Sequence, residues 1–190
     1  MSFPSFASGE VLTAADMNAV GLWKVGSFTA SAQTTLTCDN VFTSDYDNYK
    51  IVVKMGGTSN TNILFFEFIN TNGAIVNASY FSASYSRDFA TGGATGVTVI
   101  NSGARVNIGY MPNGTGNPLG AECTVYGPRL NSEWTTVTGQ YTGISSGVAY
   151  QGGEFYATCN PSPQTMRGFR VGNSAGTNMT GSVRVYGWKN

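Results

Sequence analysis

Catalytic side chains are few in this sequence, because it contains no histidine. The absence of histidine removes the usual general base, the usual zinc ligand and the Ser-His-Asp triad. The segment GISSG at 143–147 matches the GxSxG pattern of a nucleophile elbow around Ser145. That elbow needs a strand-to-helix turn and a histidine within reach, so the segment is interpreted as a loop. These residues predict a protein that is not an enzyme.

Paired carboxylates are the remaining route to glycan hydrolysis, which needs two acids at a suitable separation. The acids on or near expected strands are Glu67, Glu122, Glu133 and Glu154. They are isolated from one another in the sequence, and nothing marks two of them as a pair. They are therefore interpreted as solvated or hydrogen-bonded residues on the faces of strands.

Asp45 and Asp47, in TSDYDN at 43–48, form the densest acidic cluster. Calcium loops use an Asp-x-Asp spacing, but they supply more oxygen ligands within the next several residues. The segment is interpreted as a turn before a strand that begins at Asn48, and calcium binding is left open. The sequence predicts no metal centre and no cofactor.

Charge and cysteine content restrict the class of partner and the compartment. Ten basic and ten acidic residues balance to zero net charge, and only 11% of positions are charged. A nucleic-acid-binding protein carries a basic excess gathered into a patch, so nucleic acid is excluded as the main partner. Cys38, Cys123 and Cys159 lack a CxxC spacing and are expected to be buried free thiols. Neither a signal peptide nor an apolar run that could insert into a membrane is expected.

Aromatic residues make up 13% of the chain, and tyrosine serves both cores and wet binding surfaces. The segment SYFSASYSRDF at 79–89 is the richest candidate for an exposed, receptor-facing loop. In that loop Tyr80, Phe81, Tyr85 and Arg87 would stack and hydrogen-bond on a sugar or a protein. The alternative is that Tyr80 and Phe81 finish a strand that points into the core.

The first 22 residues are expected to form an N-terminal attachment segment. Pro4 and Gly9 indicate an extended leader over 1–12, and Thr13 as N-cap predicts a short α-helix over 13–20. Two helical turns are not stable alone, so this segment must pack on its own domain or on another chain. Contacts to another chain are predicted, through the apolar side chains Phe3, Phe6, Leu12, Met17 and Trp23.

From Trp23 onward the apolar residues alternate with a period of two, which indicates β-strands. Strands are expected at 23–30, 33–38, 48–55, 61–69, 74–81, 104–111, 120–127, 134–143, 148–158, 166–172 and 181–189. Asn72-Gly73 predicts a hairpin between the strands at 61–69 and 74–81. Many short strands with no second helix predict an all-β, antiparallel, jelly-roll-like β-sandwich over residues 23–190.

Three segments resemble proteins of tailed bacteriophages. GEVLTAADMNAVGLW at 9–23 is similar to the N-terminal segment of many tail-fibre and minor tail proteins. FTSDYDNYKIVV at 42–53 resembles a strand of small phage β-sandwich proteins, and GSVRVYGWKN at 181–190 resembles their closing strand. The three segments cover both ends and the early core, and the middle of the chain diverges.

The resemblance implies a virion structural protein, made in the host bacterial cytoplasm and assembled as a homotrimer. It implies attachment to other virion proteins through the N-terminal segment and display of a jelly-roll-like domain on the particle. Two functions stay open. One is a tail-fibre or minor tail protein whose loops recognise a host-surface glycan or protein receptor. The other is a capsid decoration, head-fibre or adaptor protein that binds only other virion proteins.

Overall fold

The computed structural model describes residues 21–57, 62–89, 94–111, 118–130, 133–144, 150–159 and 165–189. Within these ranges the chain is all-β, and it contains no helix. The twelve strands are β1 (Trp23–Gln33), β2 (Thr35–Cys38), β3 (Asn48–Gly57), β4 (Asn62–Asn70), β5 (Tyr80–Asp88), β6 (Ala94–Gly103), β7 (Val106–Met111), β8 (Leu119–Tyr126), β9 (Thr135–Ile144), β10 (Tyr150–Cys159), β11 (Met166–Asn173) and β12 (Met179–Trp188).

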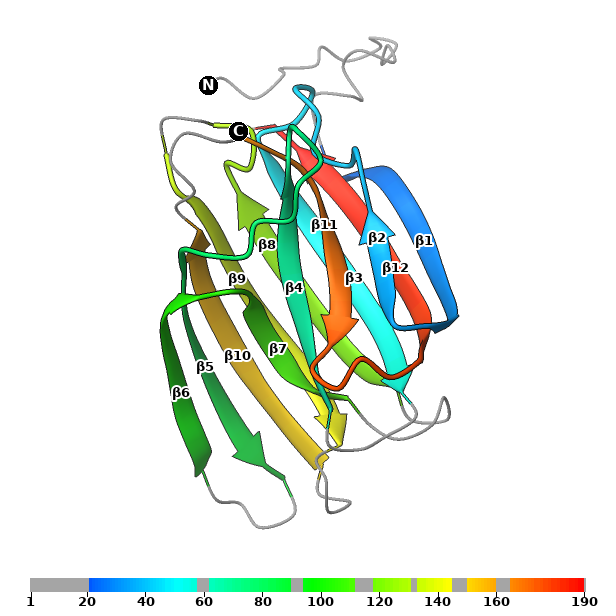
Figure 1. The fold of residues 1–190 in the computed structure, drawn as a ribbon, viewed down its shortest axis with the longest axis vertical. Coiled ribbons are helices and arrows are strands. Elements are labelled where there is room, and N and C mark those ends of the chain that lie inside the picture. Colours follow the sequence, from blue (N-terminus) through cyan, green and yellow to red (C-terminus); the bar gives the residue numbers. More distant parts are fainter. Residues whose placement is uncertain are drawn as a thin grey trace, which may run out of the picture.

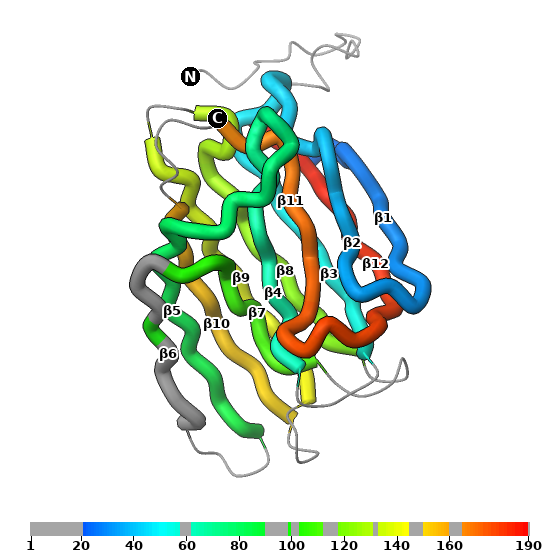
Figure 2. Tube along the Cα trace, viewed as in Figure 1, coloured from blue at the N-terminus to red at the C-terminus, as the bar shows by residue number. Residues whose placement is uncertain are grey.

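The strands form two antiparallel sheets that face each other as a β-sandwich (Figure 1). The larger sheet has the order β1-β12-β3-β8-β9-β10-β5-β6, and the smaller has the order β2-β11-β4-β7. Strand β5 of the larger sheet lies past the edge of the smaller sheet (Figure 2), and β6 pairs with β5 as the last strand of the order. The expected all-β antiparallel class is therefore confirmed.

The core fills the space between the sheets, because alternate residues of each strand point inward. On β8, for example, Leu119, Ala121, Cys123 and Val125 are buried, while the residues between them are more exposed. Aromatic rings pack at the centre of this core. Phe66 contacts Phe68 with ring centroids 4.7 Å apart and Phe169 with centroids 4.9 Å apart. Such packing adds about 1 kcal/mol per pair to the free energy of burial.

The prediction of buried free thiols is confirmed. Cys38, Cys123 and Cys159 are all buried and none forms a disulfide. Burial in apolar surroundings raises the pKa of each thiol to about 12, so the cysteines are chemically inert at neutral pH.

The predicted hairpin at Asn72-Gly73 is wrong beyond Val76. The turn itself forms, with Gly73 at a φ of 85° and its N–H bonded to the carbonyl of Asn70. Residues 74–76 then run back along β4 for one bridge, between Ile69 and Ile75, with hydrogen bonds from the Asn70 N–H to the Ala74 carbonyl and from the Val76 N–H to the Phe68 carbonyl. The pairing is much shorter than the expected strand at 74–81, and the next strand, β5, joins the other sheet. A nucleating turn favours local pairing, but the burial of Tyr80 decides where the chain continues.

The expected leader and helix at 1–20 lie outside the described residues, as do Phe3, Phe6, Leu12 and Met17. Trp23 is the first residue of β1 and pairs with Gly187 of β12. Its side chain is partly buried, and its indole N–H is buried without a hydrogen-bond partner in the described part of the chain.

Candidate binding face

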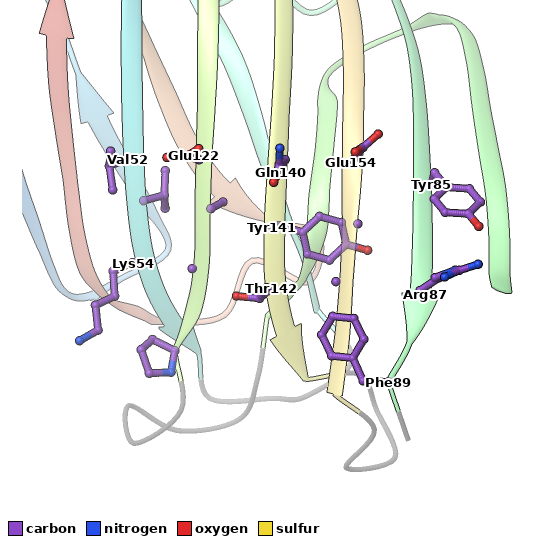
Figure 3. A pocket seen from close by; sticks show the side chains of 16 residues that line it. Val52, Lys54, Tyr85, Arg87, Phe89, Glu122, Gln140, Tyr141, Thr142 and Glu154 are labelled. Atoms are coloured by element: carbon purple, nitrogen blue, oxygen red, sulfur yellow. The ribbon is translucent and has the colours of Figure 1, made fainter. Parts of the chain in front are cut away.

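The candidate site lies on the outer face of the larger sheet, the face that points away from the smaller sheet. Strand register places residues of five neighbouring strands in rows across this face. One row reads Val52, Glu122, Gln140, Glu154 and Tyr85, and the next reads Lys54, Gly120, Thr142, Gly152 and Arg87. Figure 3 shows side chains of both rows around one hollow.

This hollow has a volume of about 820 Å³. Ligand pockets in proteins span roughly 300–1,000 Å³, so the space suits a ligand of moderate size. Tyr85, Arg87 and Phe89 line it on the β5 side, and Val52, Lys54 and Pro118 line it on the β3 and β8 side. The outer residues of β8, β9 and β10 form the floor between them.

Gly120 leaves the floor of this open hollow without a side chain at one position. Gly120 faces open space: an added Cβ would find only the Thr142 hydroxyl oxygen, at 3.6 Å. Packing therefore does not require a glycine at this position. A glycine inside a strand also lowers the stability of the fold relative to alanine, so its presence here needs another reason. An outward glycine with free space above it is typical of a place where a ligand approaches the backbone closely.

An aromatic wall bounds the hollow on the β5 side. Phe89 follows β5 directly, and its N–H bonds to the carbonyl of Tyr150 at 2.7 Å. Its ring lies over Gly152, since a Cβ there would be 2.4 Å from the ring. Tyr85 is 38% exposed and Phe89 is 58% exposed, so both rings are open to solvent.

Hydrogen-bonding groups occupy the centre of the face. Gln140 lies between Glu122 and Glu154, directly across from both. Glu122 pairs with Lys50 at 2.9 Å, and Glu154 accepts a hydrogen bond from the Tyr156 hydroxyl. That hydrogen bond raises the pKa of Tyr156, because it favours the protonated phenol. The centre therefore presents two carboxylate acceptors that neighbouring side chains hold in place, with the Gln140 amide between them.

Two smaller hollows adjoin the first along β9 and β10. The second, about 250 Å³, shares Glu122, Gln140 and Glu154 with the first. The third, about 330 Å³, shares Tyr156 with the second. Phe81, at its edge, stacks on Trp134 with centroids 6.2 Å apart and planes 13° from parallel. The three hollows form a continuous track, which we call the outer-face track.

The predicted receptor-facing loop is wrong in its conformation and in one residue. Residues 80–88 form strand β5, and Tyr80 is fully buried. The Tyr80 hydroxyl accepts a hydrogen bond from the Phe68 N–H and donates one to the Val76 carbonyl. Burial raises the pKa of Tyr80. Phe81, Tyr85 and Arg87 are exposed and lie along the track, as alternate residues of a strand do.

Glu122, Gln140, Glu154, Tyr156 and Trp134 complete the track and were not predicted as a group. Each lies on or next to an expected strand, at an outward position. The alternation of polar and apolar residues could identify them as outward-facing. Their meeting depends on which strands are neighbours, and that information is not local to any strand.

The other sequence candidates lie elsewhere. Glu67 is buried on the smaller sheet and is paired with Arg170. Asp45 lies in a turn, as predicted. Its carboxylate accepts a hydrogen bond from the Thr43 hydroxyl. Ser145 lies outside the described residues. Across the described ranges no three acidic or cysteine residues cluster as metal ligands, and no helix is long and apolar enough to span a membrane.

No protein-family model, curated protein or solved structure matches this chain. The geometry of the outer-face track and the segments that resemble phage proteins are therefore the basis for a proposal of function.

Proposed function

We propose that the protein is a bacteriophage virion structural protein, a tail-fibre or minor tail protein that displays its β-sandwich for host-surface recognition. The observation that carries this proposal is the gathering of exposed apolar side chains on one face. Exposed apolar patches mark interaction sites. Most large apolar side chains that are exposed in the described ranges lie on the outer face of the larger sheet: Val52, Phe81, Tyr85, Phe89, Val99, Tyr126, Trp134, Tyr150 and Tyr156.

We infer that the sandwich is a jelly roll with two inserted strand pairs. Without β5, β6, β9 and β10, the sheets read β1-β12-β3-β8 and β2-β11-β4-β7. The first of these eight strands then pairs with the last, the second with the seventh, the third with the sixth and the fourth with the fifth. This nested order is that of a long hairpin rolled into two sheets, as in the jelly rolls of viral capsids and lectins. The inserted pairs widen one sheet and carry much of the track.

The N-terminal segment 1–22 is proposed to attach the protein to other virion proteins. Its support is the resemblance of residues 9–23 and the apolar side chains that two helical turns leave unpacked. A homotrimer is proposed with it, on the same resemblance. A protein lacking residues 1–22 should keep the sandwich and fail to enter particles. Normal incorporation of the truncated protein would refute the attachment role.

The competing function is a capsid decoration, head-fibre or adaptor protein. The charge-poor composition also suits a subunit buried among other virion proteins. In that case the outer-face track would be an interface within the particle, and free protein would have no affinity for cells.

Binding to host cells tests the proposed function. Purified full-length protein should bind host cells and reduce infection when it is added before the phage. The same protein should not bind cells of a strain that the phage cannot infect. If the protein neither binds host cells nor reduces infection, host recognition is refuted and the alternative, a protein that binds only other virion proteins, is favoured.

A further inference from the structure

We propose that the outer-face track binds a neutral glycan of several hexopyranose units. In this assignment a sugar ring stacks on Tyr85 and Phe89, and its hydroxyl groups bond to Glu122, Gln140 and Glu154. The inference rests on the proposed function, because it names the chemical class that the recognising face would take.

A pyranose ring has an apolar face of C–H bonds and a rim of hydroxyl groups, so it needs a flat apolar surface beside hydrogen-bonding groups. The track supplies both at adjacent positions. Tyr85 of β5 is directly across from Glu154 of β10, and Gln140 is next in the same row. Exposed aromatic rings present flat surfaces, while carboxylates and amides offer acceptors and donors in fixed directions.

Charge favours a neutral ligand over a polyanion. Two bases, Lys54 and Arg87, and two acids, Glu122 and Glu154, line the main hollow and cancel. Lys50, which lines the second hollow, is paired with Glu122 and adds no free negative or positive partner at the centre of the track. The acids lie in the row of Gln140, on β8 and β10, whereas the bases lie at the two ends of the next row, on β3 and β5. An anionic chain along the centre would meet the carboxylates first, and like charges at close range repel.

The open floor supports a ligand that lies against the sheet. Gly120 leaves its outer position empty although an added Cβ would meet only the hydroxyl oxygen of Thr142, at an ordinary contact distance of 3.6 Å. A glycan chain that follows β9 and β10 can then reach the sheet surface. A larger apolar side chain at position 120 would occupy that space without disturbing the core.

The length of the track favours an oligosaccharide over a single sugar. Each hollow shares lining residues with the next: Glu154 lines the first and second hollows, and Tyr156 lines the second and third. The track begins at Phe89 and ends at the stack of Phe81 on Trp134. A second aromatic surface at the far end gives a longer chain an additional place to stack. Affinity is therefore expected to rise with chain length.

An array of neutral oligosaccharides of glucose, galactose, mannose and N-acetylglucosamine, from disaccharides to hexasaccharides, tests the inference on the full-length protein. The native protein should bind one neutral series, with higher affinity for longer members. Tyr85→Ala and Gly120→Val should each weaken binding about tenfold or more, since one loses the stacking surface and the other fills the floor. Trp134→Ala should weaken binding of the hexasaccharide and leave the disaccharide unchanged.

Matched variants separate this site from general damage. Tyr110→Ala removes an exposed tyrosine from β7 of the smaller sheet, away from the outer-face track, and Ser27→Val adds a branched side chain on the exposed surface of β1. Both should bind like the native protein. Equal binding by native protein, Tyr85→Ala and Gly120→Val would overturn the assignment to the track.

The outcome on cells distinguishes this inference from the proposed function. Protein that binds host cells but no neutral glycan, or only polyanionic glycans in low salt, overturns the glycan inference and leaves host recognition standing. Protein that binds neutral glycans through the track but never binds host cells supports the glycan site and overturns host recognition.

Discussion

Glycines at the residue scale divide into those that packing demands and those that it does not. Gly139 of β9 points into the core, where an added Cβ would lie 2.3 Å from the Phe155 ring and 2.7 Å from Cβ of Cys123. Gly120 of β8 points outward into open space. The first glycine is thus structural, whereas the second leaves the floor of the track open.

Replacement of these two glycines by alanine is expected to have opposite effects on stability. Gly139→Ala should lower the free energy of unfolding by about 1–3 kcal/mol, because the core must move to admit the methyl group. Gly120→Ala should raise it by about 0.5–1 kcal/mol, because alanine loses less backbone entropy on folding. Urea denaturation measures both. A destabilised Gly120→Ala would show that packing, rather than a ligand, requires this glycine.

Asp39 and Arg167 form a bidentate ion pair between the turn after β2 and strand β11. The guanidinium Nε and Nη2 lie 2.8 and 2.6 Å from the two carboxylate oxygens. The hydrogen bonds from Arg167 hold the pKa of Asp39 below its usual value. Both side chains are about one-third exposed, so the pair contributes on the order of 1 kcal/mol or less.

This ion pair predicts a pH dependence of stability. A carboxyl group whose pKa is lower in the folded state stabilises the fold above its unfolded pKa of about 3.9 and loses that effect as the pH falls through its folded pKa. Asp39→Asn should therefore be less stable than the native protein at pH 7, and the difference should shrink below about pH 4. Urea denaturation at pH 7 and pH 3 measures it. A difference that is constant with pH would contradict the role of the carboxylate charge.

At the element scale, Tyr80 fixes the path from β4 to β5. Its ring stacks parallel to Phe68, with planes 7° apart, and its hydroxyl bonds to the backbone at Phe68 and Val76. The side chain thus connects β5 of the larger sheet to β4 of the smaller one. This connection is consistent with a pairing that ends at Val76, after which the chain enters the larger sheet.

Removal of the Tyr80 hydroxyl is expected to weaken that connection. Tyr80→Phe leaves a buried N–H and a buried carbonyl without their partner, which should cost about 1–3 kcal/mol in the free energy of unfolding. Tyr126→Phe, at an exposed position, is the matched control and should change stability by less than about 0.5 kcal/mol. If the two variants unfold at the same urea concentration, the hydrogen bonds of the Tyr80 hydroxyl do not stabilise the connection between β4 and β5.

Strand positions could be predicted from alternation, but strand neighbours could not. The ranges expected around Ile51, Val125 and Val185 match β3, β8 and β12, because each has a clear period of two. The range around Phe66 matches β4, because a short, continuous apolar run indicates a strand that is buried on both faces. Strand β6 is not among the expected strands, although it contains the β-branched run VTVI at 97–100; only its first three residues belong to TGGATG, which indicates a turn. The partners of β5 are β6 and β10, and β10 follows β5 by more than sixty residues, so no local pattern encodes that pairing.

Single residues of the candidate site could be predicted from the sequence, but their grouping into one site could not. Tyr85 and Arg87 were identified because aromatic and basic residues cluster in one segment. Glu122, Gln140 and Glu154 come from three strands, and only the register of β8, β9 and β10 brings them together. A site built from single residues of several strands requires the tertiary structure.

At the scale of the whole molecule, the two faces of the sandwich differ. The outer face of the larger sheet carries the outer-face track and most of the exposed aromatic rings of the described ranges. On the smaller sheet, Phe65 is covered by the Arg105 guanidinium and Glu67 is paired with Arg170. A recognition role assigns the open face to the host and leaves the other surfaces for assembly.

The most direct test of this account is the accessibility of the track in intact particles. A single thiol introduced by Thr142→Cys lies on the exposed floor, while the three native thiols are buried and should not react with maleimide. Intact particles that carry Thr142→Cys should react with maleimide, and particles with the native protein should not. A bulky label on this thiol should block adsorption to host cells. A thiol that reacts in free protein but stays protected until the particle is dissociated would contradict host recognition by this face.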